Sequence, residues 1–360
     1  MAKKNYQTLI ESLDKRTNPE KILLEKAFSD ELGKIPYKYA QIYIQKAMRG
    51  VEPEYTQNTI EAGKKVLEKL KDELSNVDFE FQGSVMTNTN IKGYSDIDLL
   101  TICNKFVTPD RQNIERILQD PYSVLKYSQV DRQVLTEAIN PPYYTGNYLS
   151  DLQQLRADDE RILKKAYNHV DITNPKSIVV SVSTPKRDVD VVIANWYNNA
   201  NYYLQKKKTY RGIQVYNKDL NRALPADYPF LSIERINDKD SSVGGRLKKM
   251  IRFLKTVKGD SAVEIELSSF TIYAICYNLE ISLYRTSNDL ELVSAILFQM
   301  NSLLTNFSQR FNLQSVDDKE FVFRNDDQKT EDTKKVQSLK QLATEIEIIL
   351  EDIKTEIIYG

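Results

Sequence analysis

The sequence predicts an α+β protein of two lobes, in which helices and a mixed sheet come first and a helical bundle ends the chain. Three observations predict this class. Several short apolar segments have the alternation or the β-branched content of strands. The segments before and after them carry Leu, Ile and Val at helical spacing between charged residues. The length of 360 residues is enough for two domains.

The elements follow in a simple order along the chain. Strands are predicted over residues 77–82, 95–103, 177–183 and 188–194. Helices are predicted over residues 5–32, 54–76, 110–140, 147–169, 242–258, 262–281, 288–312 and 331–358. We therefore expect residues 1–230 to hold the N-terminal helices and the sheet, and residues 231–360 to form a C-terminal helical lobe.

Composition excludes several classes of protein. Lys and Arg total 50 and Asp and Glu total 51, so the near-neutral charge gives no support for a surface devoted to nucleic acid. No apolar run is long enough for a transmembrane helix and the start of the chain is polar, so neither a transmembrane helix nor a signal peptide is expected. Cys103 and Cys276 lie in apolar runs and are expected to be buried thiols in a reducing cytoplasm.

Scarce residues narrow the chemistry further. His169 is the only histidine, and it stands near the end of a predicted helix with no Ser or Cys motif beside it. A zinc finger or a Ser-His-Asp triad is therefore not expected. The chain has neither a GxxxxGK[ST] nor a GxGxxG sequence, which leaves P-loop and Rossmann sites without support. Carboxylate and metal chemistry remains.

The strongest functional signal is a small turn followed by two acidic residues. Gly83-Ser84 ends a predicted strand, and Asp96 and Asp98 begin the next one. Residues two apart on a strand point to the same face, so Asp96 and Asp98 would share one face while Ile97 points to the core. Such a turn can bind phosphate, and neighbouring carboxylates can bridge metal ions.

A third carboxylate is expected on an adjacent strand. Asp190 stands between Val189 and Val191, where an unpaired charge would be costly, so it is the preferred candidate. Asp188 shares its face and is the competing candidate, but it follows Lys186-Arg187 and stands nearer the start of the strand.

These residues together resemble the DNA polymerase β-like nucleotidyltransferases, and within them the bacterial cGAS/DncV-like nucleotidyltransferases. The positions that match the family pattern in register are Gly83, Ser84, Thr89, Ile91, Ser95, Asp96, Asp98 and Leu99. Asn88 stands where the family more often has Gly, and Asn tolerates left-handed backbone angles. The segment Val189–Ala194 is similar to the family's third-carboxylate strand, with Ile193 in place of Pro.

The resemblance implies a fold, a reaction and further site residues. The fold is a bilobal polymerase β-like core with a C-terminal helical bundle. Lys255 and Ser269 resemble the family's residues that contact the donor triphosphate, beside Gly83 and Ser84. The implied cofactor is Mg²⁺, two ions held by Asp96, Asp98 and Asp190, with Mn²⁺ as the alternative. The implied activity joins NTPs into a cyclic di- or trinucleotide messenger and releases pyrophosphate, in anti-phage (CBASS) defence.

The resemblance also implies partners, and two other functions stay open. A downstream effector of the cyclic nucleotide is expected, and an E1-like partner could conjugate the chain through Gly360. A DNA-sensing zinc insertion is not expected, because its Cys and His ligands are missing. The first alternative is another polymerase β-like nucleotidyltransferase, acting on RNA or a small molecule. The second is a nucleotide-binding scaffold, against which the three retained carboxylates argue.

Overall fold

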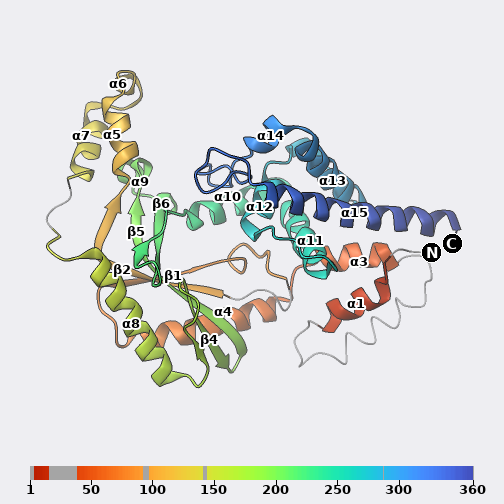
Figure 1. Ribbon diagram of the computed structural model, residues 1–360, viewed down its shortest axis with the longest axis horizontal. Helices are drawn as coiled ribbons and strands as arrows, with labels where there is room; N and C mark the ends of the chain where they lie inside the picture. Colours follow the sequence, from red (N-terminus) through yellow and green to blue (C-terminus); the bar gives the residue numbers. More distant parts are fainter. Residues whose placement is uncertain (1–3, 16–38, 92–96, 141–143, 287, 360) are drawn as a thin grey trace. The chain divides into compact units, whose positions relative to one another are not determined.

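The chain folds into two compact units, each of which draws on separate stretches of sequence. The computed structural model describes residues 4–15, 39–91, 97–140, 144–286 and 288–359. One unit, here the helical unit, comprises Met1–Glu52, Thr87–Ser95 and Arg235–Gly360. The other, the sheet unit, comprises Pro53–Met86 and Asp96–Glu234. The strands and helices are shown in Figure 1.

This division differs from the expected one at residue 230. The N-terminal helices α1 (Tyr6–Lys15) and α3 (Tyr39–Met48) belong with the C-terminal helices and not with the sheet. The physical reason is a shared core, in which Tyr43 and Ile44 of α3 are buried in one cluster with Leu342 and Ile346. The predicted boundary at 230/231 lies close to the observed one at Glu234/Arg235.

The sheet unit is built on a seven-stranded mixed sheet. Five strands follow the order β1-β2-β5-β4-β3, β6 also pairs with β5, and β7 pairs with β6. The strands are β1 (Val77–Gln82), β2 (Ile97–Pro109), β3 (Val170–Asp171), β4 (Ile178–Ser183), β5 (Lys186–Asn198), β6 (Arg211–Asn217) and β7 (Arg222–Ala223). The central pair β2 and β5 is parallel, whereas β1 and β4 are antiparallel to their neighbours. The four predicted strands are confirmed, and β3, β6 and β7 were not predicted.

Both faces of this sheet are covered by apolar side chains. On one face Ile97 and Leu99 are fully buried in a cluster with Val66 and Leu152, which come from α4 (Pro53–Lys71) and α8 (Tyr148–Ala166). The two helices lie along the sheet in Figure 1. Gly63 lets α4 approach closely, because a Cβ there would stand 2.7 Å from the ring of Phe81. The predicted core orientation of Ile97 is therefore confirmed.

Shorter helices complete the sheet unit. They are α5 (Arg111–Gln119), α6 (Ser123–Lys126), α7 (Gln129–Ala138), α9 (Ala200–Gln205) and the 3₁₀ helix η2 (Lys208–Tyr210). A small separate core joins Ile114 of α5, Leu135 of α7 and Ala200 of α9. The opposite face of the sheet carries a second cluster that includes Leu100 and Trp196.

The helical unit contains the remaining helices. They are α11 (Arg246–Asp260), α12 (Ser269–Tyr277), η3 (Ile281–Tyr284), α13 (Asp289–Thr305), α14 (Phe307–Phe311) and α15 (Thr333–Tyr359), while α10 (Pro229–Ser242) runs through the boundary between the units. Residues 262–268, predicted to be helical, form a loop that ends at Ser268, whose side chain caps α12 by accepting from the Thr271 N–H at 3.1 Å. None of the helices among the described residues has the length and apolarity needed to cross a membrane.

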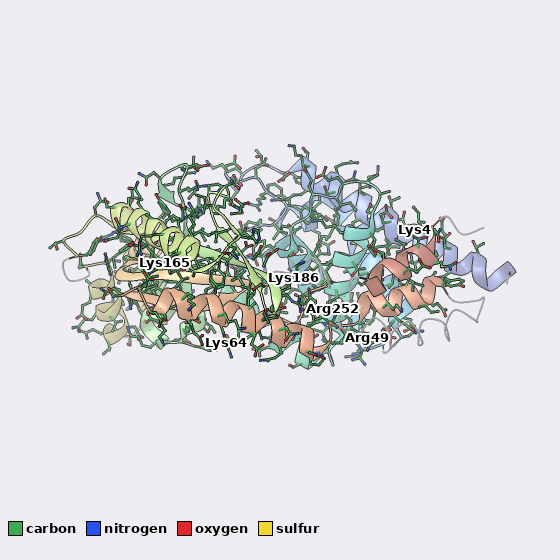
Figure 2. All side chains as sticks on the ribbon, turned by 90° about the horizontal axis from the view of Figure 1, so that it is seen from below. Lys4, Arg49, Lys64, Lys165, Lys186 and Arg252 are labelled. Carbon is green, nitrogen blue, oxygen red and sulfur yellow. The ribbon has the colours of Figure 1, made fainter. Side chains whose placement is uncertain are left out.

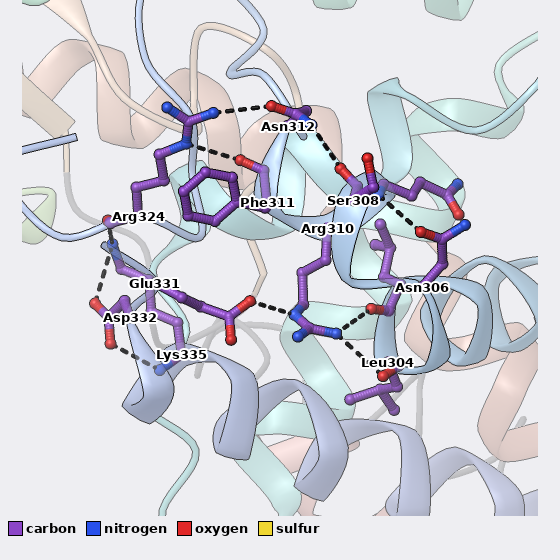
Figure 3. Close-up of polar contacts among 12 residues, drawn as sticks. Leu304, Asn306, Ser308, Arg310, Phe311, Asn312, Arg324, Glu331, Asp332 and Lys335 are labelled. Carbon is purple, nitrogen blue, oxygen red and sulfur yellow. Dashed lines mark hydrogen bonds and ion pairs between the residues drawn. The ribbon is translucent and has the colours of Figure 1, made fainter. Parts of the chain in front are cut away.

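Two arginines organise the irregular chain between α14 and α15 (Figure 3). Arg310 donates to the Glu331 carboxylate at 2.8 Å and to the Leu303 carbonyl at 2.7 Å. Arg324 donates to the Phe311 carbonyl at 2.9 Å, and its guanidinium lies 4.0 Å from the Phe311 ring centroid. These contacts satisfy carbonyls at the ends of α13 and α14 that have no partner within the helix, and they fix the segment that leads into α15.

Candidate active site

The two acidic residues predicted on different strands meet in the sheet unit. Asp98 of β2 and Asp190 of β5 are direct partners in the register of the parallel pair. Both are half-buried, while Ile97, Leu99, Val189 and Val191 beside them are fully buried on the other face. The strand register therefore fixes both carboxylates on one face, side by side on neighbouring strands.

The competing residue Asp188 has a different environment. It is exposed, and its carboxylate accepts a hydrogen bond from the Ser181 hydroxyl at 2.6 Å. Its register partner is Ser181 on β4, on the side of β5 away from β2. The strand register thus favours Asp190 over Asp188 as the partner of Asp98. The predicted ligand Asp96 lies outside the described residues, and so does Gly360.

The predicted phosphate turn lies directly against Asp98. Gln82, the last residue of β1, is the register partner of Asp98, and Gly83 follows with φ +93°. A Cβ at Gly83 would stand 2.9 Å from Asp98 Oδ2, a separation that real Cβ atoms essentially never show. The Met86 N–H closes the turn by donating to the Gly83 carbonyl at 3.2 Å. Glycine is required here both by the backbone angle and by the carboxylate.

The second half of the motif is held by side chains of the helical unit. Asn88 has φ +52°, so the left-handed conformation expected for Asn in place of Gly is observed. The Thr89 hydroxyl is 2.8 Å from the Thr87 hydroxyl and 2.8 Å from the Tyr273 hydroxyl. Thr87 and Thr89 are buried, and their hydroxyl contacts hold this loop.

The two predicted triphosphate contacts lie on α11 and α12. Lys255 is 9% exposed, and its ammonium donates to the Thr89 carbonyl at 3.0 Å. Burial, with a smaller effect from Lys258, lowers the pKa of Lys255 to about 8. Ser269 is exposed as the first residue of α12. Lys255 thus contacts the motif through its backbone, and Ser269 is accessible at a helix N-terminus, where anions bind favourably.

The residues present fit a hard divalent cation. Asp98 and Asp190 offer carboxylate oxygens from adjacent strands, the ligand type that Mg²⁺ prefers. Within the described ranges no group of three or more His, Cys, Asp or Glu converges in a metal-binding arrangement. The pair supplies two of the three predicted ligands, and the third, Asp96, belongs to the undescribed segment. Cys103 and Cys276 are buried free thiols, as expected, and take no part.

Sequence reasoning missed several polar contacts on the same face of the sheet. Trp196 Nε1 donates to the Asp78 carboxylate at 2.7 Å, and the Arg211 guanidinium lies 3.7 Å from the Trp196 ring centroid. Lys208 pairs with Glu80 of β1. A run of three lysines such as Lys206–Lys208 is typical of a solvated turn, and the only signal of these contacts in the sequence is the adjacent pair Tyr210-Arg211. These contacts brace the strands that carry the two carboxylates.

Comparison with known families and structures agrees with this architecture. Residues 64–203 match the nucleotidyltransferase domain family, and residues 234–346 match the cGAS/DncV-like nucleotidyltransferase C-terminal helical domain. The c-di-GMP synthase of Capnocytophaga granulosa is 45% identical over 99% of both chains. A c-di-GMP synthase from Flavobacteriaceae sp. is 39% identical over 98% of both chains.

Solved structures give the same result. The structure of a STING-associated CdnE c-di-GMP synthase from Flavobacteriaceae sp. has a TM-score of 0.83 at 38% identity, covering 98% of this chain and all of that one. That of the Capnocytophaga granulosa enzyme has a TM-score of 0.76 at 40% identity, covering 98% of this chain and 99% of that one. The sheet with its paired carboxylates, the helical unit and these relatives agree: the chain is a nucleotidyltransferase and belongs to the cGAS/DncV-like family of the polymerase β-like superfamily.

Proposed function

We propose that this chain is a metal-dependent cyclic dinucleotide synthase that joins two GTP molecules into c-di-GMP and releases two pyrophosphates. The observation that carries the proposal is the register pair Asp98 and Asp190 beside the Gly83 turn, in a chain 45% identical along its length to a c-di-GMP synthase. The choice of guanine and of a two-nucleotide ring is inferred from the relatives. The nucleotidyl transfer itself is inferred from the residues of the site.

The roles of the site residues follow from their placement. Asp98 and Asp190, with Asp96, are proposed as the metal ligands. The Gly83-Ser84 turn is proposed to bind the triphosphate, with the Ser84 hydroxyl and the backbone N–H groups as donors. Lys255 and Ser269 are proposed as further contacts to the donor nucleotide. In each transfer a ribose hydroxyl oxygen bonds to the α-phosphorus, the bond to pyrophosphate breaks, and the hydroxyl proton is lost.

Mg²⁺, or Mn²⁺ as the alternative, would supply charge neutralisation and a more acidic attacking hydroxyl when bound. The chain's own contribution is to hold oxygen ligands in a fixed arrangement. Asp98 is held by the register of three strands and by the close approach of Gly83. Because β2 and β5 are buried on their opposite face, the backbone positions of Asp98 and Asp190 are fixed by the core.

The proposed setting follows from the relatives. Two relatives of known structure are described as STING-associated, so we propose a cyclic dinucleotide receptor as the downstream effector and anti-phage defence as the role. A cytoplasmic location is proposed because the NTP substrates are found there. Conjugation of Gly360 by an E1-like partner stays a prediction.

Mass spectrometry of the products formed from all four NTPs with Mg²⁺ tests the proposal. We expect c-di-GMP and pyrophosphate, and an Asp98→Asn variant that retains the fold should lose at least about a hundredfold in rate, as when a charge-stabilising group is removed. A cyclic product with other bases would correct the base choice only. Transfer to RNA or to a small molecule, with no product from NTPs alone, would replace the proposed function by the first alternative.

A further inference from the structure

Helix α11 carries two buried cations that both reach the same short loop. Arg252, labelled in Figure 2, is 8% exposed and Lys255 is 9% exposed. Arg252 Nη1 donates to the Asn88 carbonyl at 2.7 Å, and Lys255 Nζ donates to the Thr89 carbonyl at 3.0 Å. The two residues are three apart on the helix and therefore lie on one face of it. Both bonds end on backbone atoms of the segment between Gly83 and Asp98.

Arg252 makes a second contact that Lys255 does not. Its Nε donates to the Met48 carbonyl at 2.8 Å, at the C-terminal end of α3. One planar guanidinium thus joins three segments that are distant in sequence: α3, the loop and α11. A lysine ammonium has no rigid fork, so it could not hold both carbonyls in the same way.

These cations are buried without a carboxylate partner in the described part of the chain. Neither residue forms an ion pair there. Burial lowers the pKa of both, and the charge of Asp240 opposes this shift only in part for Arg252. Burying a charge is costly unless it is paired or well hydrogen-bonded. Two such charges directed at two consecutive carbonyls hold this loop against α11, and replacing either by an apolar residue would leave a carbonyl without its donor.

The conformation of the loop itself carries an energetic cost. Asn88 has a positive φ, which non-glycine residues rarely adopt. Asn90 is fully buried, and neither polar atom of its side chain has a hydrogen-bond partner among the described residues. A conformation with these two costs persists only when the surroundings impose it. Arg252, Lys255 and Tyr273 are the surroundings that do so here.

We propose that Arg252 is a positioning residue that fixes the Thr87–Asn90 loop, and through it the nucleotide-binding turn at Gly83-Ser84, by joining the loop to α3 and α11. The inference rests on the proposed nucleotide-binding role of that turn. The loop follows Gly83 by only four residues, so its position constrains where the turn can bind a triphosphate. Arg252 itself need not touch the nucleotide.

The test measures nucleotide affinity, which does not depend on the product. Equilibrium binding of fluorescent GTP and ATP analogues with Mg²⁺ is compared for the wild type, Arg252→Gln and Arg252→Lys. We expect Arg252→Gln to raise the Kd, and the KM of the reaction, by about tenfold or more, since misplacing a binding group by about 1 Å can cost a hundredfold. Arg252→Lys should lie between the two, because it keeps one charged donor.

A matched control lies on the same helix. Arg246 is half-buried on α11, and among the described residues it donates locally, to the Val243 carbonyl at 2.8 Å, so Arg246→Gln should leave Kd and KM unchanged. If Arg252→Gln does not fold, Tyr273→Phe provides the second measurement. It removes only the hydroxyl that contacts Thr89, and we expect a Kd rise of about threefold to tenfold, the worth of one hydrogen bond.

The outcomes separate the two proposals. A wild type that binds nucleotide but makes no cyclic product would overturn the proposed function and leave the Arg252 comparison readable through Kd. Folded Arg252→Gln and Tyr273→Phe variants with wild-type Kd and KM would overturn the positioning role, even if their melting temperatures fell. Equal changes in Arg246→Gln and Arg252→Gln would overturn it as well. A wild type that binds neither nucleotide would overturn both.

Discussion

Replacing Gly83 by Ala tests the contact between the phosphate turn and the first carboxylate most directly. The added methyl group would stand 2.9 Å from Asp98 Oδ2, and the residue would have to keep φ +93°. Two costs therefore arise at one position. The backbone cost falls on the turn, and the steric cost falls on the carboxylate or on the strand that carries it.

The magnitude can be worked out from these two terms. A non-glycine residue in the left-handed region costs about 1–2 kcal/mol. Inserting a methyl group into a filled space costs about 1–3 kcal/mol more. If the second term is relieved by moving Asp98 away from its productive position, it appears in the rate, and about 1–3 kcal/mol corresponds to roughly a 5- to 150-fold loss.

Gly245 provides the matched control in the same chain. It has φ +80°, and a Cβ there would meet no atom within 4 Å. Gly245→Ala should therefore carry the backbone cost alone, with a fall in melting temperature of about 2–8 °C. We expect its kcat to stay near the wild-type value. Pyrophosphate release from GTP at saturating Mg²⁺, measured with thermal melting of both variants, makes the comparison.

If folded Gly83→Ala keeps its kcat while Gly245→Ala shows an equal loss of stability, the approach of Gly83 to Asp98 has no catalytic consequence. A kcat loss in Gly83→Ala that higher Mg²⁺ fully restores would locate the effect in metal affinity. Equal rate losses in both variants would show that backbone strain, and not the carboxylate contact, is what matters.

Two further predictions concern carboxylates elsewhere in the sheet unit. Asp190→Asn should lower kcat by about 10²–10³-fold, whereas the exposed Asp188→Asn should stay within about twofold; a loss confined to Asp188→Asn would reverse the assignment. Burial raises the pKa of Asp159 on α8 to about 8, and the Thr101 hydroxyl and Arg156 lower it only in part. The folded state holds this proton more tightly than the unfolded state, so Asp159 should destabilise the protein increasingly as pH rises from about 4 to 8. Thermal melting across this range should show a flatter pH profile and a higher melting temperature at pH 8 for Asp159→Asn; an unchanged profile would show that this carboxyl does not titrate there.

The local elements of the fold could be predicted because their sequences contain the deciding pattern. The strand over residues 77–82 alternates apolar and polar side chains, and its observed bounds agree with the prediction. Strand β6 was missed because Arg211–Asn217 mixes Gly and polar residues, and its pairing with β5 depends on residues far away. The prediction of a helix over residues 262–268 was wrong for the opposite reason. The apolar residues Ile265 and Leu267 are buried by tertiary contacts and not by a helix.

Some residues of the candidate site could likewise be predicted from the sequence, and others could not. Asp98, Asp190 and Gly83 could be found from sequence because strand periodicity and a glycine turn state their geometry directly. Arg252 could not, because nothing in the α11 sequence distinguishes it from the other arginines and lysines of that helix. Its burial is decided by α3 and by the Asn88 loop. Its hydrogen-bond partners there lie 204 and 164 positions away in the sequence.

The motif that identifies the family is continuous in sequence but belongs to two compact units. Gly83–Met86 and Asp98 pack with the sheet, whereas Thr87–Ser95 belongs with the helices. The family match over residues 64–203 therefore contains the loop but not Arg252, Lys255 or Tyr273, which hold it. Gly83 and Asp98 lie on neighbouring strands of one sheet, so the number of residues between them decides whether the turn meets the carboxylate. This explains in physical terms why the spacing from Gly83 to Asp98, and not the residue types alone, carried the prediction from sequence.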